Sequence, residues 1–462
     1  MARTQGKTYE IDMCSGAILP KLLQFSMPLM CSSILQLLFN AADIIVVGRF
    51  AGDNSLAAVG STSSIINLLV NLFMGLSIGA NILAARYYGA QEKEGLRQTV
   101  HTAMLMSFIC GVVMAAVGFL GAEMILRWVQ SPEEVRGLAA IYLKIYFLGM
   151  PATMLYNFGA ALLRAVGDTR RPLYYLVASG IVNVILNLIF VIEIHMDVAG
   201  VALATVISQC MSASLVVWCM LRETGGVHLD LRQLRIHRVR MKQILQVGLP
   251  AGFQSALFSL SNVVIQSAVN LFGEVIVAGS AAACNIEGFV YISMNAFYQG
   301  TVSFSSQNYG AGKYERLRPI LLRAQGCAIV TGLIFGGFAT IFAPTLISIY
   351  SGSPDVIVAG VERLRIVCLP YFLCGMMEVM VGALRGLGYS VMPMIVALVG
   401  ACGLRILWVS TIFQIPEFHS ISTVYWSYPI SWLLTFLAHL CCYVWAWKRL
   451  KRQIEKEKML RT

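Results

Sequence analysis

The feature that most constrains the fold of this chain is a succession of about twelve long apolar runs separated by short links. A helix that crosses a bilayer needs roughly 20 predominantly apolar residues in a row, and each run reaches that length. To within several residues the runs are 22–47, 55–85, 99–121, 138–161, 173–194, 198–221, 244–270, 277–305, 320–343, 357–383, 391–414 and 424–447. Only 12% of the residues are Asp, Glu, Lys or Arg, about half the share of a soluble domain. We therefore predict an all-α integral membrane protein with about 12 transmembrane helices.

The distribution of Lys and Arg predicts the orientation of these spans. Of the 34 basic residues, 27 lie in the leader, the central link, the tail and alternate links of each half. Cytoplasmic loops are enriched in Lys and Arg, so both termini are predicted to be cytoplasmic, in a bacterial plasma membrane. The formal net charge of +11 then reflects membrane orientation, and we expect no nucleic acid partner.

The chain lacks the sequence signatures of a cofactor or metal centre. Its twelve cysteines include no C-x-x-C pair, and its six histidines form no H-E-x-x-H motif. The phosphate-binding pattern G-x-x-x-x-G-K-[ST] is also absent, which argues against ATP hydrolysis. We predict that the protein is not an enzyme and needs no cofactor.

The two halves of the chain match each other, which indicates an internal duplication. Pairs displaced by 221 residues are Tyr88-Gly89-Ala90 and Tyr309-Gly310-Ala311, Leu163-Arg164 and Leu384-Arg385, Gly167 and Gly388, and Pro172 and Pro393. Pairs displaced by 222 residues are Pro28 and Pro250, Asn40 and Asn262, and Phe50 and Phe272. A single insertion reconciles the two displacements, and shared membrane composition would not produce polar and glycine pairs at one fixed spacing.

Six spans per half make the repeats parallel, related by an axis along the membrane normal. We predict two six-helix lobes around a central cleft, with the first lobe at 19–221 and the second at 244–447. A cytoplasmic leader at 1–18 precedes them, and a basic cytoplasmic tail at 448–462 follows. The inter-lobe linker at 222–243 is predicted to be a solvated cytoplasmic crossover helix.

Ionisable side chains deep in a span are functional candidates, because each costs roughly 2.5–3.5 kcal/mol on insertion scales. The clear cases are Asp43, Glu287, Glu378 and Arg405. Residues expected nearer the membrane surface are Lys144, Glu193, Glu123, Arg127, Glu362, Arg363 and Arg365, the last five as side chains that snorkel to the headgroups.

Asp43 is the candidate for cation coupling in the first lobe. A carboxylate in a span that lacks a cationic partner must bind a proton or a metal cation. Asn40 lies one turn before it, and Asn183 and Asn187 share one face of the fifth span. These oxygens suit Na⁺ or a proton relay equally, and an Asp that fixes buried backbone is the structural alternative.

Glu287 and Glu378 are the candidates for substrate binding or protonation in the second lobe. Their carboxylates would attract a cationic compound into the cleft. Arg405, in the eleventh span, is expected to neutralise one of them. A purely structural Glu–Arg pair is the alternative for whichever glutamate it reaches.

With these features the chain resembles the multidrug and toxic compound extrusion (MATE) family. The resembling motifs are F-S-M-P at 25–28, Ala42-Asp43 followed by V-G-R-F-A-G at 47–52, L-A-A-V-G at 56–60, A-L-L-R-A-V-G-D-T-R-R-P at 161–172 and A-L-R-G-L-G-Y-S at 383–390. The resemblance extends from about residue 19 to 448. It implies twelve spans in two lobes, export of amphipathic and often cationic organic compounds, and coupling to inward Na⁺ or H⁺.

The family has branches that differ in their acidic residues. Asp43 matches a first-span Asp that most branches share, and Glu287 matches the Ile-Glu pattern of the DinF-type branch. Asn187 stands where the archaeal-type branch has an Asp, and Phe258 and Cys374 stand where the NorM-type branch has acids. The resemblance therefore favours the bacterial DinF-type or a related branch.

The leading hypothesis is a secondary active exporter of drugs or toxic organic cations that works as a monomer among membrane lipids. H⁺ or Na⁺ binding near Asp43 would bias the lobes between two access states. One alternative is a flippase for lipid-linked precursors, which would need more interior basic residues than Arg405 and Lys144 for a pyrophosphate. A membrane-embedded protein without transport activity is the other, and it leaves the duplication unexplained.

Overall fold

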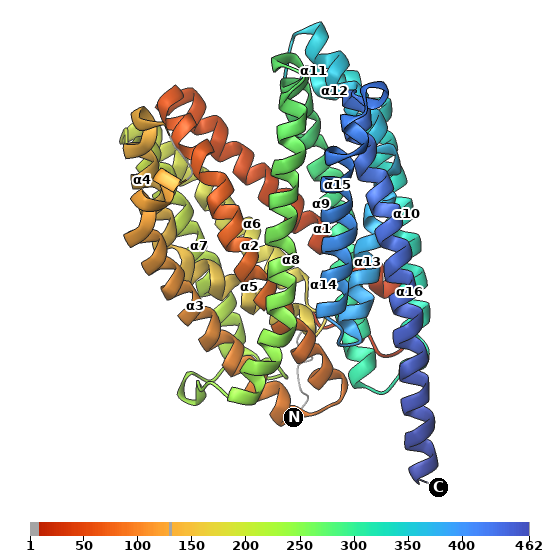
Figure 1. Cartoon of the computed structure of the whole chain (residues 1–462). Helices are drawn as coiled ribbons and strands as arrows, with labels where there is room; N and C mark the ends of the chain where they lie inside the picture. The colour runs from red at the N-terminus through yellow and green to blue at the C-terminus, as the bar shows by residue number, and fades with distance from the viewer. Residues whose placement is uncertain (1–8, 129–131, 462) are drawn as a thin grey trace. The chain divides into compact units, whose positions relative to one another are not determined.

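The computed structural model describes residues 9–128 and 132–461, and every regular element within them is a helix (Figure 1). Among these residues, eleven helices are long and apolar enough to cross a membrane, and the bent pair Glu133–Leu148 and Met150–Ala165 makes a twelfth span. The predicted all-α membrane fold is confirmed. Part of the predicted leader with Arg3 and Lys7, the link at 129–131 and Thr462 lie outside the described residues.

The helices follow one another with short connections. Those of the first half are α1 (Ile18–Val46), α2 (Asp53–Gly89), α3 (Lys93–Trp128), α4 (Glu133–Leu148), α5 (Met150–Ala165), α6 (Arg170–Leu188) and α7 (Asp197–Arg222). Those of the second half are α8 (Arg238–Asn270), α9 (Glu274–Gly310), α10 (Leu317–Ile341), α11 (Ala343–Ser348), α12 (Pro354–Val367), α13 (Phe372–Gly386), α14 (Val391–Ala397), α15 (Leu404–Ser410) and α16 (Ile421–Arg461).

The chain forms two compact units, which we call the first and second lobes. The first contains residues 9–13 and 27–252, and the second contains 14–26 and 253–461. These bounds differ from the predicted 19–221 and 244–447, because α1 and α8 are each divided between the lobes. Both divisions lie within three residues of a proline inside the helix, Pro28 in α1 and Pro250 in α8. Proline removes a backbone hydrogen bond there and weakens the helix locally.

The backbone repeats the duplication seen in the sequence. The long helices α2 and α9 both have 37 residues and begin after Gly52 and Gly273, whose φ angles are 86° and 88°. Gly167 and Gly388, which follow α5 and α13, have φ angles of 94° and 102°. These positions are displaced by 221 residues and need glycine, because a side chain is strained at such φ values.

The change in displacement from 222 to 221 has a structural explanation. The first half has one residue more than the second between Phe50 and Gly52, namely Ala51. This residue ends a π-helical segment, Val47–Ala51, that continues α1. A π-helical turn accommodates one extra residue within a helix, so the insertion is absorbed without displacing α2.

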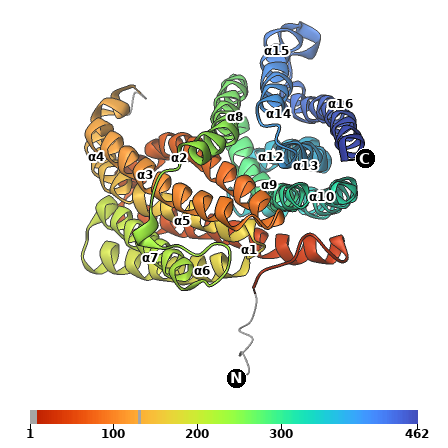
Figure 2. The same cartoon turned by 90° about the horizontal axis from the view of Figure 1, so that it is seen from below.

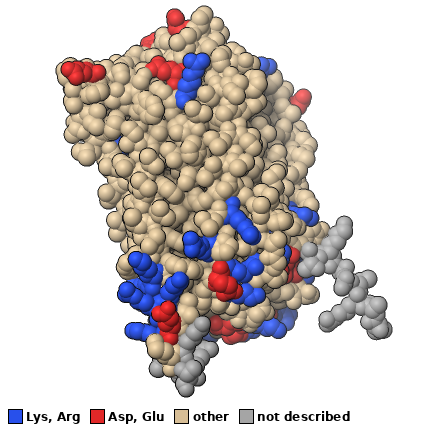
Figure 3. Space-filling model, turned by 90° about the vertical axis from the view of Figure 1, so that its right-hand side faces the viewer, with Lys and Arg blue, Asp and Glu red and all other residues tan. Residues whose placement is uncertain are grey.

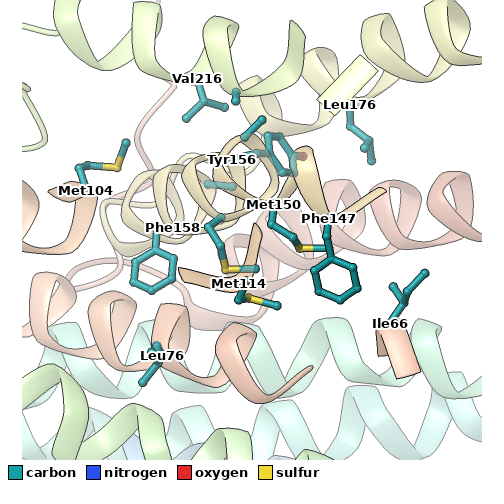
Figure 4. Close-up of a cluster of buried hydrophobic side chains, with 14 of the residues drawn as sticks. Ile66, Leu76, Met104, Met114, Phe147, Met150, Tyr156, Phe158, Leu176 and Val216 are labelled. Carbon is teal, nitrogen blue, oxygen red and sulfur yellow. The ribbon is translucent and has the colours of Figure 1, made fainter. Parts of the chain in front are cut away.

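In the first lobe, α5 lies at the centre and packs against α2, α3 and α7 (Figure 2). Its side chains join an apolar core that includes Phe147, Phe158 and Met150, all fully buried (Figure 4). Gly118 of α3 allows Phe147 of α4 to pack closely against α3, since a Cβ atom at Gly118 would lie 2.0 Å from the Phe147 ring. In the second lobe, α13 has the corresponding place and packs against α9, α10 and α16.

The predicted crossover helix at 222–243 is wrong. After α7 ends at Arg222, this linker has only a single 3₁₀ turn, Leu231–Gln233, before α8 begins at Arg238. Val227 and Leu229 are buried against the first lobe, so the linker is partly packed rather than solvated. Glycines at 225 and 226 disfavour a helix there.

Candidate functional site

In the first lobe, Asp43 near the end of α1 meets Asn187 of α6. The Asn187 side-chain amide donates a hydrogen bond to Oδ1 of Asp43 and another, of 3.3 Å, to Oδ1 of Asn183. Asn183 in turn donates to Oγ1 of Thr205 in α7, at 3.4 Å. Asn183 and Asn187 are buried, and their spacing of four residues places them on one face of α6.

Two features of this cluster bear on its chemistry. Among the described residues, no Lys, Arg or His pairs with the Asp43 carboxylate, and Oδ1 of Asn187 has no hydrogen-bond donor. Tyr142 and Tyr146 of α4 lie near enough to interact with the charge of Asp43. The carboxylate therefore has an amide as its hydrogen-bond partner, and no described residue supplies a counter-charge.

The structure brings together three of the four residues predicted for this site. Asn40 is the exception, because its side chain is exposed and makes no hydrogen bond with any described residue. Sequence reasoning missed Thr205, Tyr142 and Tyr146. No spacing rule connects α4 or α7 to α1, so only the tertiary fold identifies them.

In the second lobe, Glu287 of α9 forms a buried ion pair with Arg363 of α12. Nε and Nη2 of Arg363 donate to the two carboxylate oxygens at 2.7 and 3.0 Å, and Nη1 donates to Oγ of Ser280 at 2.8 Å. The Arg363 side chain is only 3% exposed. Two predictions were therefore wrong: Arg363 does not snorkel to the headgroups, and Arg405 forms an ion pair with neither Glu287 nor Glu378 in the described residues. The apolar face of α12, which includes Val356, Ala359 and Val367, directs Arg363 inward.

Arg405 of α15 binds uncharged partners instead. Its Nε donates to Oγ of Ser431 at 2.9 Å, and its guanidinium lies over the rings of Tyr428 and Trp432, with centroid distances of 4.4 and 5.7 Å. The Tyr428 ring also lies 5.5 Å from the guanidinium carbon of Arg363. Tyr428 of α16 thus lies against both Arg363 and Arg405.

Glu378 of α13 has no hydrogen bond or ion pair with any described residue. Arg385 is one of the buried residues of the same helix. That guanidinium donates to the Tyr298 hydroxyl and, at 2.7 Å, to Oε1 of Gln254. Glu378 is therefore the second-lobe candidate whose carboxylate remains unoccupied.

The oxygen atoms around Asp43 suit a hard cation or a proton. Carboxylate, amide and hydroxyl oxygens are the ligands that such cations prefer, while His and Cys ligands suit transition metals. Within the described chain, no group of three His, Cys, Asp or Glu residues could bind a metal ion. The chemistry available in both lobes is binding, charge neutralisation and proton exchange.

Two helical repeats that each enclose their own polar cluster are typical of membrane transporters. The sequence profile of the MatE family matches residues 28–189 and 250–409, which together cover most of the chain. The chain belongs to the MatE family. The predicted family resemblance is thereby confirmed, while the branch remains a prediction.

Similar proteins agree with this family. The probable multidrug resistance protein YoeA of Bacillus subtilis (strain 168) is 25% identical over 441 residues and covers 94% of each chain. The probable multidrug resistance protein YpnP of the same strain is 26% identical over 398 residues, covering 85% of this chain and 88% of YpnP. A solved structure described as the outward-facing conformation of a multidrug resistance MATE family transporter of the MOP superfamily has a TM-score of 0.89. It is 23% identical, covers 98% of this chain and 100% of its own, and shares the fold.

Proposed function

We propose that the protein is a secondary active exporter that moves amphipathic organic compounds out of the cell in exchange for an inward cation, H⁺ or Na⁺. The observation that carries the coupling step is Asp43, a carboxylate in a membrane span that has no cationic partner among the described residues and accepts a hydrogen bond from Asn187. The multidrug resistance names of YoeA and YpnP support the substrate class.

In this proposal, the charge state of Asp43 biases an equilibrium between two access states. The ionised carboxylate binds the Asn187 amide or a cation, whereas the protonated carboxyl is itself a hydrogen-bond donor. The free Oδ1 of Asn187 would accept a hydrogen bond from that carboxyl group. A ligand shifts such an equilibrium only by its differential affinity for the two states, and the changed partner at Asp43 provides that difference.

The divided helices provide a path by which a local change could reach both lobes. Asp43 and Pro28 lie in α1, and the first residues of that helix belong to the second lobe. A bend at Pro28, and at its counterpart Pro250 in α8, would alter the relation between the lobes without unfolding either one. We propose these prolines as the hinges of alternating access.

For substrate recognition, we propose that Glu378 attracts the cationic end of a substrate. Glu287 is occupied by Arg363 and acts mainly to keep that arginine in place. The cytoplasmic placement of both termini is supported by the distribution of charge: on the face in Figure 3, Lys and Arg gather toward one end, and a broad uncharged band separates them from the other. We propose a monomer in the bacterial plasma membrane.

The flippase alternative has one structural observation in its favour, the burial of Arg363, Arg385 and Arg405 in the second lobe. However, Arg363 is neutralised by Glu287, and Arg385 is occupied by Tyr298 and Gln254. Arg405 alone among these three then has unoccupied N–H groups at its edge, which is too little for a pyrophosphate, so the exporter remains the better-supported proposal.

The coupling step is tested in proteoliposomes with imposed gradients of Na⁺ or of pH. We expect Asp43→Asn to abolish gradient-driven efflux of an amphipathic dye while the variant reconstitutes like wild type, because Asn cannot change its charge. The matched control is Asp355→Asn, an exposed Asp in the first turn of α12, which should leave efflux unchanged. Undiminished efflux by Asp43→Asn would remove this residue from the mechanism, and the gradient that drives wild-type efflux identifies the ion.

A further inference from the structure

The charges buried in the second lobe do not cancel. The ion pair of Glu287 with Arg363 is neutral as a unit, since both carboxylate oxygens accept from the guanidinium. Arg405 has no such partner: no described carboxylate forms an ion pair with it. Its side chain is nevertheless buried, with 3% of the residue exposed.

The position of Arg405 is well defined even though its charge is unpaired. Nε is fixed by Oγ of Ser431, and that hydroxyl donates to the carbonyl oxygen of Tyr428 at 2.9 Å. The plane of the guanidinium is supported by the rings of Tyr428 and Trp432. Trp432 is itself supported by Tyr371, with a centroid distance of 4.8 Å. These contacts involve Nε and the π face of the guanidinium, and they leave its far edge free.

That far edge is the part of an arginine that binds anions. Nη1 and Nη2 of Arg405 make no hydrogen bond with any described residue. Neither atom is completely enclosed by the described protein. A guanidinium stays protonated in proteins, so Arg405 cannot relieve its burial by losing its charge. A buried cation of this kind requires a counter-charge, and paired N–H groups at a planar edge match the geometry of a carboxylate or a phosphate.

We propose that Arg405 binds an anionic group, a carboxylate or a phosphate, of the transported compound. The inference rests on the proposed export function and specifies its substrates: zwitterionic or acidic amphiphiles are bound better than compounds with positive charge alone. The rings of Tyr428 and Trp432 then contact the apolar part of the ligand beside its charged group.

Glu378 fits the same assignment as a group of opposite charge. Glu378 and Arg405 belong to the same lobe. They do not pair with each other. An unoccupied carboxylate and an unoccupied guanidinium in one lobe complement the two ends of a zwitterion.

Two matched dyes test the assignment. Rhodamine 110 has a free carboxylate, and rhodamine 123 is its methyl ester, so the two differ only in the negative charge. Binding to the purified full-length protein in detergent is followed by fluorescence anisotropy. We expect wild type to bind rhodamine 110 more tightly, and Arg405→Gln to weaken rhodamine 110 binding by about tenfold or more while rhodamine 123 binding changes less than about twofold.

The matched control is Arg365→Gln, which removes one positive charge from an exposed position of α12 and should change neither affinity. Arg405→Lys keeps the charge but loses the planar edge, and it should bind rhodamine 110 with intermediate affinity. This variant also keeps the test decisive if Arg405→Gln does not fold.

Equal weakening of both dyes by Arg405→Gln, or no weakening of either, would overturn the proposal. No weakening of either dye is expected if Arg405 binds only a small inorganic anion or forms an ion pair with Glu378. The export function is judged separately, from gradient-driven rhodamine 123 efflux by wild type. Absence of that efflux would overturn the proposed function while the equilibrium binding comparison still decides the role of Arg405.

Discussion

The ion pair between Glu287 and Arg363 offers the sharpest test of how this structure is stabilised. Replacing Glu287 by Gln preserves the shape of the side chain but removes the negative charge opposite Arg363. The guanidinium then remains buried with a neutral partner, since only 3% of its side chain is exposed. Removing one partner of a buried pair costs far more than removing both, because the remaining charge is left uncompensated.

The expected magnitude follows from the geometry. Loss of one partner of a buried, hydrogen-bonded pair costs about 3–5 kcal/mol. The Gln oxygen can still accept one of the two hydrogen bonds, now 2.7 and 3.0 Å, so we expect the lower end of that range. A cost of about 3 kcal/mol lowers the folding equilibrium constant by a factor on the order of 100.

A double-mutant cycle isolates the pair. Unfolding of Glu287→Gln, Arg363→Met and the double variant is followed by circular dichroism as dodecyl sulfate is added to dodecyl maltoside micelles. We expect the double variant to be more stable than the sum of the single effects, with a coupling energy of about 2 kcal/mol. The exposed pair of Glu123 with Lys144 is the control, and neutralising it should not move the midpoint. Additive single effects would refute the idea that these charges depend on each other.

Two further predictions concern the contact of residues 9–13 with the rest of the first lobe. Gly167→Ala should lower the thermal midpoint, because a Cβ atom there would lie 2.6 Å from the backbone N and O of Ile11 at a φ of +94°. Gly137→Ala in α4, where a Cβ meets nothing within 4 Å, should not lower it. Burial raises the pKa of Glu10, which accepts a 2.8 Å hydrogen bond from Tyr88 and also faces Glu223, Asp168 and Arg171. Because the pKa is higher in the folded protein, the contribution of Glu10 to stability is lost as the pH rises through that pKa. Glu10→Gln should therefore raise the thermal midpoint at pH 8 and leave it unchanged near pH 4, and a higher midpoint at both values would contradict this sign.

The fold could be predicted from the sequence because its determinants are visible as patterns along the chain. A span is a continuous apolar run, and the duplication appears as pairs at a fixed displacement. The i, i+4 spacing of Asn183 and Asn187 placed both on one face of α6, as the structure has them. The division of α1 and α8 between the lobes was not predicted, since hydropathy reports which residues are in the membrane but not which helix they contact.

The ion pairing could not be predicted, for a related reason. Arg363 lies between Glu362 and Arg365, and a cluster of charges near the end of a span is typical of the membrane surface. Its partner Glu287 is 76 residues away, and no sequence rule connects them. The assignment of Arg405 to a glutamate failed similarly, because the choice between two buried arginines depends on the angle between helices.

The duplication itself separates what builds the fold from what makes the site. Positions kept in both halves are structural: Gly52 and Gly273 begin the long helices, and Pro28 and Pro250 lie where the lobes divide α1 and α8. The charged candidates are not kept. At the displacement of 222, Asp43 corresponds to Ile265, and at 221, Glu287 and Arg363 correspond to Ile66 and Tyr142. At these three positions the other lobe thus has an apolar or uncharged residue. Such divergence on a shared scaffold is what we expect if the lobes have different tasks, with cation coupling in the first and substrate recognition in the second.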